Sequence, residues 1–158
     1  MGTTVKTIYD AQIATLKSLF PQLNERVQIY DGRFEVSDID EVTISPPEMF
    51  VTNLGGSTTS PSFNIVDHDD SWVVIIAAKQ TGLADNENET APHLATELCL
   101  SLQRQLWGLD VEVIGMPENI KSVPVNQNRD GIFLWAVTWD QTFRTGTGSG
   151  IGIDLGNS

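Results

Sequence analysis

The sequence predicts one α+β domain in which two main helices pack on one face of an antiparallel or mixed β-sheet. Two observations lead to this fold class. Apolar residues recur at steps of three to five positions in two segments, one near the N-terminus and one in the second half of the chain, as in amphipathic helices. Apolar and polar residues alternate along 131–144, as in a strand with one buried face. Because several further strand-like runs separate the helices, the order favours segregated helices over a repeating βαβ pattern.

The first predicted element is a helix from Thr4 to Phe20. Thr3 or Thr4 can cap its start, and Pro21 ends it because proline has no backbone N–H to donate. An apolar stripe of this kind packs in the core far more often than it binds a partner, so we expect it to be buried. The stripe consists of Val5, Ile8, Ile13, Leu16 and Phe20.

Short strands are expected after this helix. Residues Val27 to Tyr30 are rich in β-branched and aromatic side chains, and 34–44 is predicted to be a loop or a weak edge segment. Met49 to Leu54 predicts a strand that ends at the following glycine pair, because such a pair commonly marks a turn. The small polar residues from Ser57 to Ser62 then predict a loop.

The middle of the chain predicts a hairpin and the centre of the sheet. Two apolar runs, Phe63 to Val66 and Trp72 to Ala78, flank the polar tetrapeptide Asp67-His68-Asp69-Asp70, which we expect to be the hairpin turn. The second run shows no alternation between apolar and polar residues. Strands covered on both faces lack such alternation, so this run is expected in the middle of the sheet.

A second helix is predicted from Pro92 to Trp107. Proline fits its first turn, and Gly108 fits the left-handed position that follows the last turn. After it we expect a short strand at 111–114 and an irregular segment at 117–125. The helix has a broad apolar face, which predicts packing against the sheet. That face consists of Leu94, Leu98, Leu102 and Leu106.

The closing strand, Gly131 to Arg144, has the clearest pattern in the chain. It holds two of the four tryptophans, and burial of such large side chains contributes more per residue than burial of smaller ones. One face is therefore expected in the core and the other nearer to water. The first face carries Phe133, Trp135, Val137, Trp139 and Phe143, and the second carries Thr138, Asp140, Thr142 and Arg144.

Composition and charge narrow the functional classes. The 158 residues suit one domain, and nine Lys and Arg against 21 Asp and Glu give a net charge of −12. Tight binding of DNA or RNA needs Lys and Arg to neutralise phosphates, so it is not expected. Cys99 is the only cysteine, which excludes an internal disulfide and favours a cytosolic compartment. The chain shows neither an apolar signal core nor a run long enough to span a membrane.

Three features have the residue types of a chemical site. The acids and histidine of 67–70 could hold a metal, but four adjacent side chains in a turn point apart. Residues 85–89 alternate acids as a calcium loop does, but the glycine and closing glutamate of such a loop are missing. Cys99 has no histidine near it in the sequence and is expected to pack as a small hydrophobic residue. We therefore expect no catalytic, metal or cofactor site. A small metal-dependent hydrolase that uses His68 is the enzymatic alternative.

The C-terminal residues differ abruptly from the rest. We expect the domain to span 1–145 and residues 146–158, with five glycines, to form a flexible tail. Within the tail Ile151, Ile153 and Leu155 alternate with small or acidic residues, as in a strand. Two interpretations follow. The tail is disordered, or these three residues add to the sheet edge of a neighbouring subunit or partner.

The order of segments resembles the tail terminator, or tail completion, proteins of tailed bacteriophages and related contractile particles. A helix, DAQIATLKSLFP, is followed by a proline-flanked strand, PPEMFVTNLGG, and an apolar strand, SWVVIIAAK. Then come the helix HLATELCLSLQRQLWGLD, the short strand VEVIG and the aromatic strand GIFLWAVTWDQTFR. The resemblance covers Val5 to Arg144 and lies in the arrangement rather than in a sharp motif.

This resemblance implies a non-enzymatic structural role. Members of the family form a hexameric ring that caps the tail tube, ends its polymerisation and joins it to the head or neck. The implied partners are further copies of the chain, tube and possibly sheath proteins, and neck or head connector proteins. DNA would pass only as cargo through the lumen, which an acidic ring would not grip. The implied location is the tail or neck of a virion assembled in a bacterial cytoplasm. The alternative is another morphogenesis component, such as a head–tail connector or a tube protein.

Overall fold

Two α-helices and five strands make up the structure, which is a computed structural model that describes residues 2–30, 46–79, 87–129 and 132–146. The predicted loop at 34–44 and the tail after Gly146 lie outside the described residues. The elements confirm a single α+β domain. In chain order they are α1 (Val5–Leu19), η1 (Pro21–Leu23), β1 (Val27–Ile29), β2 (Glu48–Ser62), β3 (Ile65–Lys79), η3 (Glu87–Glu89), α2 (Ala91–Leu102), β4 (Glu118–Arg129) and β5 (Ile132–Gly146).

The strands form one mixed sheet in the order β1-β2-β3-β5-β4. β1 runs parallel to β2, and the other neighbouring pairs are antiparallel. β3 lies at the centre, and each of its residues from Trp72 to Ala78 is buried. The predicted central strand is therefore confirmed, because a strand flanked on both sides and covered on both faces has no water-facing positions to alternate.

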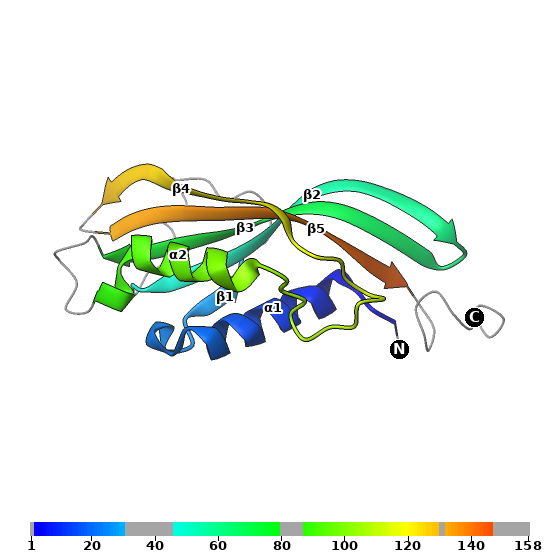
Figure 1. Ribbon diagram of the computed structural model, residues 1–158, viewed down its shortest axis with the longest axis horizontal. Helices are drawn as coiled ribbons and strands as arrows, with labels where there is room; N and C mark the ends of the chain where they lie inside the picture. The colour runs from blue at the N-terminus through cyan, green and yellow to red at the C-terminus, as the bar shows by residue number, and fades with distance from the viewer. Residues whose placement is uncertain (1, 31–45, 80–86, 130–131, 147–158) are drawn as a thin grey trace.

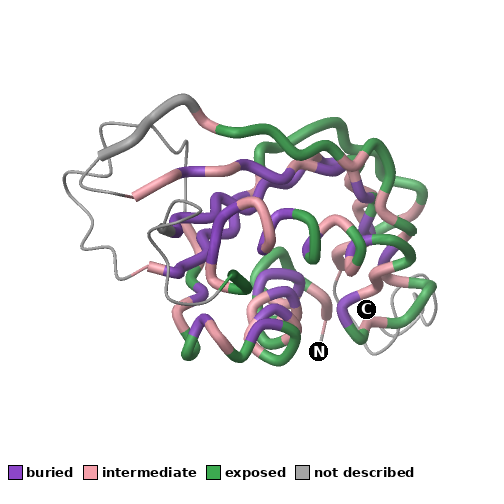
Figure 2. Tube along the Cα trace, turned by 60° about the vertical axis from the view of Figure 1, so that its left-hand side comes forward, coloured by how far each residue is buried: buried purple, intermediate pink, exposed green. Residues whose placement is uncertain are grey.

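Both helices lie on the same face of the sheet (Figure 1). Side chains from α1, α2 and the sheet join in one continuous core cluster. In Figure 2 the buried positions gather in the middle of the molecule, and exposed positions follow its outer strands. The largest side chains of this core with less than 2 % exposure are Trp72, Trp139, Ile8, Leu16, Leu23, Met49, Ile76, Leu94, Leu98 and Leu102.

The opposite face of the sheet carries a second, smaller apolar cluster. It lies over the inner halves of the three central strands and includes Leu134 and Ala136 of β5. The prediction that this face of the closing strand is nearer to water is therefore wrong for its first half. It holds for the outer half, where the face carries Thr138, Asp140, Thr142 and Arg144. The buried members of the cluster are Phe50, Val73, Ile75, Ala77, Leu134 and Ala136.

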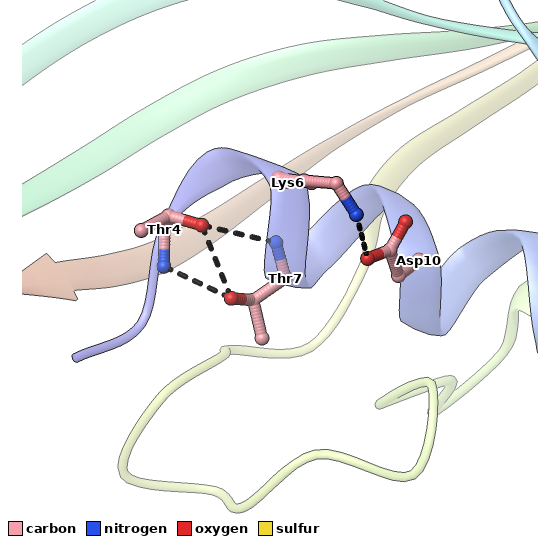
Figure 3. A network of polar contacts seen from close by, with 4 residues as sticks. All are labelled: Thr4, Lys6, Thr7 and Asp10. Atoms are coloured by element: carbon pink, nitrogen blue, oxygen red, sulfur yellow. Dashed lines mark hydrogen bonds and ion pairs between the residues drawn. The ribbon is translucent and has the colours of Figure 1, made fainter. Parts of the chain in front are cut away.

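α1 begins at the predicted cap, which is Thr4 and which forms a capping box with Thr7. The side-chain oxygen of Thr4 accepts a hydrogen bond from the backbone N–H of Thr7, and the hydroxyl of Thr7 accepts one from the backbone N–H of Thr4 (Figure 3). These bonds satisfy donors that have no partner inside the helix. One turn on, Lys6 pairs with Asp10 on the outer surface.

The buried stripe of α1 confirms the prediction for Ile8, Leu16 and Phe20, with Ile13 partly buried, but not for Val5. Val5 is 36 % exposed, whereas Tyr9 and Gln12 are buried together with Ile8 and Leu16. The 3.6-residue period places 5, 8, 9, 12 and 16 on one side of a helix. Val5 is exposed because it is the first residue of α1, at the end of this face. Sequence reasoning chose Val5 for its apolar side chain and passed over a glutamine.

The glycine pair Gly55-Gly56 does not end β2. It forms a β-bulge, at which the register with β3 shifts between Asn53 and Gly55. Gly55 takes φ +82°, and a side-chain carbon at Gly56 would lie 1.9 Å from the backbone oxygen of Asp69. Both positions therefore require glycine. The predicted loop at 57–62 is wrong, because those residues continue the strand beyond the bulge.

The region between α2 and β5 also differs from the prediction. α2 ends at Leu102 rather than Trp107, and the chain then turns at Trp107 (φ 58°) and Gly108 (φ +76°). The predicted strand at 111–114 is reduced to a single bridge between Ile114 and Phe143. The segment expected to be irregular is instead part of β4, which pairs with β5. Whether these segments form strands depends on how they pair with β5, which is distant in the sequence, and not on their local pattern of residues.

Candidate interaction site on the β2–β3 arm

The outer halves of β2 and β3 form a hairpin that extends beyond the helices at the right of Figure 1. We call residues 55–71 the arm. Its turn is Phe63-Asn64, and the two strands pair from Gly55↔Ser71 to Ser62↔Ile65. The tetrapeptide 67–70, predicted as the hairpin turn, instead lies inside β3. It pairs with β2 on one side and with β5 on the other, so its backbone groups are used in the sheet.

Strand geometry sends the four side chains of this tetrapeptide to two faces. His68 lies on the helix-side face, where its ring stacks on Phe143 with centroids 4.4 Å apart and planes 1° apart. Its Nε2 lies 2.8 Å from the hydroxyl of Thr145. The imidazole is thus held by an aromatic ring and a hydroxyl. No carboxylate among the described residues is seen to orient it by a hydrogen bond, as a catalytic dyad would.

Asp70, on the same face, joins the base of the arm to the rest of the molecule. Its carboxylate accepts a 2.8 Å hydrogen bond from the side-chain amide of Asn53. The backbone N–H of Asn53 in turn donates to the hydroxyl of Tyr9 in α1 at 2.8 Å. The side chain of Asn53 also accepts from the backbone N–H of Gly55 at 2.5 Å. These contacts fix the bulge, and with it the direction in which the arm leaves the domain.

Asp67 lies on the other face and pairs with Arg144 of β5. Arg144 donates from Nε to Oδ1 at 2.6 Å and from Nη2 to Oδ2 at 2.9 Å, a bidentate pair across two neighbouring strands. The pKa of Asp67 lies below its ordinary value of 3.8, mainly because Arg144 donates hydrogen bonds to its carboxylate. The positive charge of Arg144 lowers this pKa further but by less. The same bonds raise the pKa of Arg144. Strand pairing brings together two residues 77 positions apart in the sequence.

A cavity of about 720 Å³ opens along this side of the arm. Three carboxylates, those of Asp67, Asp69 and Glu112, lie in its lining with one cation, Arg144. Apolar side chains come from the segment after α2, where Val111 is 72 % exposed. The cavity is lined by Ser57, Thr59, Asp67, His68, Asp69, Val111, Glu112, Val113, Ile114, Gly115, Thr142, Phe143 and Arg144.

This lining has the character of a binding surface. Small hydroxyl side chains, an internal ion pair and an exposed valine offer hydrogen bonds and apolar contact. Within the described ranges, no three His, Cys, Asp or Glu side chains are grouped to hold a metal ion. Cys99 is half-buried in α2, and burial raises the pKa of its thiol despite a hydrogen bond with Ser122.

The arm itself was not predicted as a site. Sequence reasoning placed a loop at 57–62 and a turn at 67–70, so it missed the arm, its exposed turn residue Phe63 and the pair between Asp67 and Arg144. The threonines among residues 57–62, which favour strands, were the available signal. The predicted interaction residues Ile151, Ile153 and Leu155 lie outside the described residues.

Replacing Asp67 with asparagine should make the stability of the protein fall less steeply as the pH is lowered into the acid range. Because the folded pKa of Asp67 is lowered, its contribution to stability is present above the unfolded value near 3.8 and is lost as the pH falls through the lower folded value. The pair is about a third exposed, so the contribution is about 0–1 kcal/mol. Melting temperatures of both proteins, measured from pH 6 to pH 2, should converge at the acid end.

Asp10→Asn is the matched control, because it removes an ion pair whose side chains are far more exposed: Lys6 is 80 % exposed and Asp10 is 56 % exposed. A gap between wild type and Asp67→Asn that stays constant down to the lowest pH would contradict the assigned role of Arg144.

No protein-family model matches the chain, and no curated protein matches it. Among the described residues, neither helix is long and apolar enough to cross a membrane.

Proposed function

We propose that this chain is a non-enzymatic structural subunit of a phage or phage-like tail. It assembles into a ring that caps the tail tube, ends its polymerisation and joins it to the head or neck. The observation that carries the proposal is the order of elements from Val5 to Arg144. A capped helix, a long apolar central strand, a second helix on the same sheet face and a closing aromatic strand follow one another. The resemblance of the sequence to tail terminator proteins rests on this order.

The arm supports a role in assembly. A hairpin that extends past the helices, with Phe63 73 % exposed at its turn, presents apolar area that a lone domain leaves in water. The cavity beside it offers hydroxyl and carboxylate groups on a neighbouring face. Ring subunits contact two neighbours through two different surfaces, and a projecting hairpin supplies one surface that is distinct from the rest of the fold.

The net charge of −12 fits a ring through which DNA passes. Phosphates bind where Lys and Arg release condensed counterions, and an acidic lumen would let DNA move without being held. Among the side chains lining the arm cavity, Arg144 is the one cation, and Asp67 already neutralises it.

Light scattering after size-exclusion chromatography, with and without purified tail tubes, tests this proposal. We expect the mass of a closed ring, either alone or on addition of tubes, and negative-stain images with one ring at the tube end. Long filaments of the chain by itself would identify a tube protein instead. A protein that stays monomeric in both conditions and never binds a tube would refute the proposal.

A further inference from the structure

Among the residues that the structure describes, the outer half of β2 is an open edge of the sheet. β1 pairs with β2 only from Met49 to Val51, whereas β3 pairs with it into the arm. Beyond Asn53, no strand among the described residues lies on the outer side of β2, and residues 54–61 are all exposed. Unpaired N–H and C=O groups in an extended chain are a template for one more strand.

The two edges of the sheet differ in how they discourage such pairing. β4, at the far edge, has Lys121 and Pro124 within its exposed stretch. A charged side chain and a residue without N–H both disfavour a further strand. On the β2 edge, residues 55–60 are Gly, Gly, Ser, Thr, Thr and Ser, with no charge and no proline before Pro61. The β2 edge is therefore the one suited to accept a strand.

Apolar side chains stand at both ends of this open edge. Leu54, at the bulge, is 53 % exposed, and Phe63, at the turn, is 73 % exposed. An incoming strand that carries apolar side chains would contact both and remove them from water. The edge thus offers backbone pairing along its length and apolar contact at its two ends.

We propose that the C-terminal segment 147–158 of a second copy of this chain adds a strand to the outer half of β2. The inference rests on the proposed ring and names the contact between its subunits. Ile151, Ile153 and Leu155 alternate along the segment, so one face of the added strand is apolar. Its single charge, at Asp154, meets no charged residue among 55–60.

The place where the described chain ends indicates that the added strand comes from a second copy rather than from the same chain. Gly146 lies at the arm turn, because a side-chain carbon there would be 2.6 Å from the backbone oxygen of Asn64. Its N–H is held by the carbonyl oxygen of Thr3 at 3.0 Å. The twelve residues that follow span up to about 40 Å when extended. To pair within its own chain, the segment would have to reverse around the exposed Phe63 and pass β3 and β2, a lateral distance of three strand spacings, about 14 Å.

Exchange of this segment between neighbouring copies is compatible with assembly into a ring. Each copy would give one segment and receive one on a different surface, which is a head-to-tail contact that closes when the rotation permits. A glycine-rich start to the segment lets the crossing chain adapt to the angle between neighbours.

Disulfide trapping between two differently marked copies tests the contact. Both copies carry Cys99→Ala. One carries Ile153→Cys, and the other carries Thr58→Cys together with a tag that changes its mass. After mixing and mild oxidation, we expect a linked product with the mass of one tagged and one untagged copy. The matched control replaces Thr58→Cys with Lys121→Cys on the β4 edge, and its product should form at least tenfold more slowly.

Three results would overturn the inference. They are equal rates for the two edges, no linked product at all, or a double variant, Thr58→Cys with Ile153→Cys, that links only within single chains. Deletion of 147–158 should lower the assembled mass in light scattering while leaving the melting temperature of the monomer unchanged. A linked product without ring caps on tubes would refute the proposed function but keep this contact. Ring caps on tubes without a linked product would support the proposed function but refute this contact.

Discussion

Trp139→Ala is expected to lower the free energy of unfolding by about 3–5 kcal/mol. Trp139 is 1 % exposed at the middle of β5, and its ring lies 5.8 Å from that of Trp107. Removing it opens a cavity between the sheet and the segment after α2, and nearby backbone in a five-stranded sheet cannot collapse to fill it. The Nε1 hydrogen bond to Gln141, at 3.0 Å, is lost as well.

Trp135→Ala is the matched control for this variant. It lies on the same face of the same strand but is only partly buried, and its Nε1 donates to Ser122 at the surface. Urea unfolding followed by far-UV circular dichroism compares the two without depending on tryptophan fluorescence. A Trp139→Ala midpoint no lower than that of Trp135→Ala would show that residue 139 does not hold the core together.

Gln141→Met is expected to cost about 2–4 kcal/mol, although the two side chains are of similar size. Gln141 is 1 % exposed, and its side-chain amide makes four hydrogen bonds. Its oxygen accepts from Nε1 of Trp107 and of Trp139, each at 3.0 Å. Its nitrogen donates to the carbonyl oxygens of Gln105 at 2.9 Å and Gly115 at 2.7 Å. Methionine would leave the two buried indole N–H groups and the two partly buried carbonyl oxygens without this partner.

Gln12→Met provides a control of the same chemistry with the opposite expectation. Gln12 is also fully buried, but its amide nitrogen and oxygen have no hydrogen-bond partner within the described residues. Replacing an unsatisfied amide with a thioether removes a desolvation cost, so stability should stay the same or rise. Equal losses in both glutamine variants, measured by chemical denaturation, would contradict the role assigned to the network around Gln141.

The same network explains why the end of α2 could not be predicted from the sequence. The leucine pattern continues to Leu106, but Trp107 must turn inward to reach Gln141, 34 positions later in the chain. The carbonyl of Gln105 is taken by the same side chain. Contacts of this range are set by packing and leave no local pattern, so the predicted helix ran five residues too far.

The arm shows why the candidate site could not be predicted from the sequence. A glycine pair and a run of four polar residues signal turns in most contexts. Here Gly55 and Gly56 allow a bulge against Asp69, and Asp67 and His68 find partners in Arg144 and Phe143 of β5. Those partners exist only after β5 has paired with β3.

Elements whose burial follows from their own side chains were determined by the sequence alone. These are the capped first helix, the central strand with its unbroken apolar run, and the aromatic face of the closing strand. Local periodicity and capping chemistry suffice there, because each residue's preference agrees with its final place. Only the tertiary structure decided the length of β2 and β3, the existence of β4 and the ion pair of the arm. Each of these depends on a strand far away in the sequence, whose backbone groups and side chains supply the missing half of the interaction.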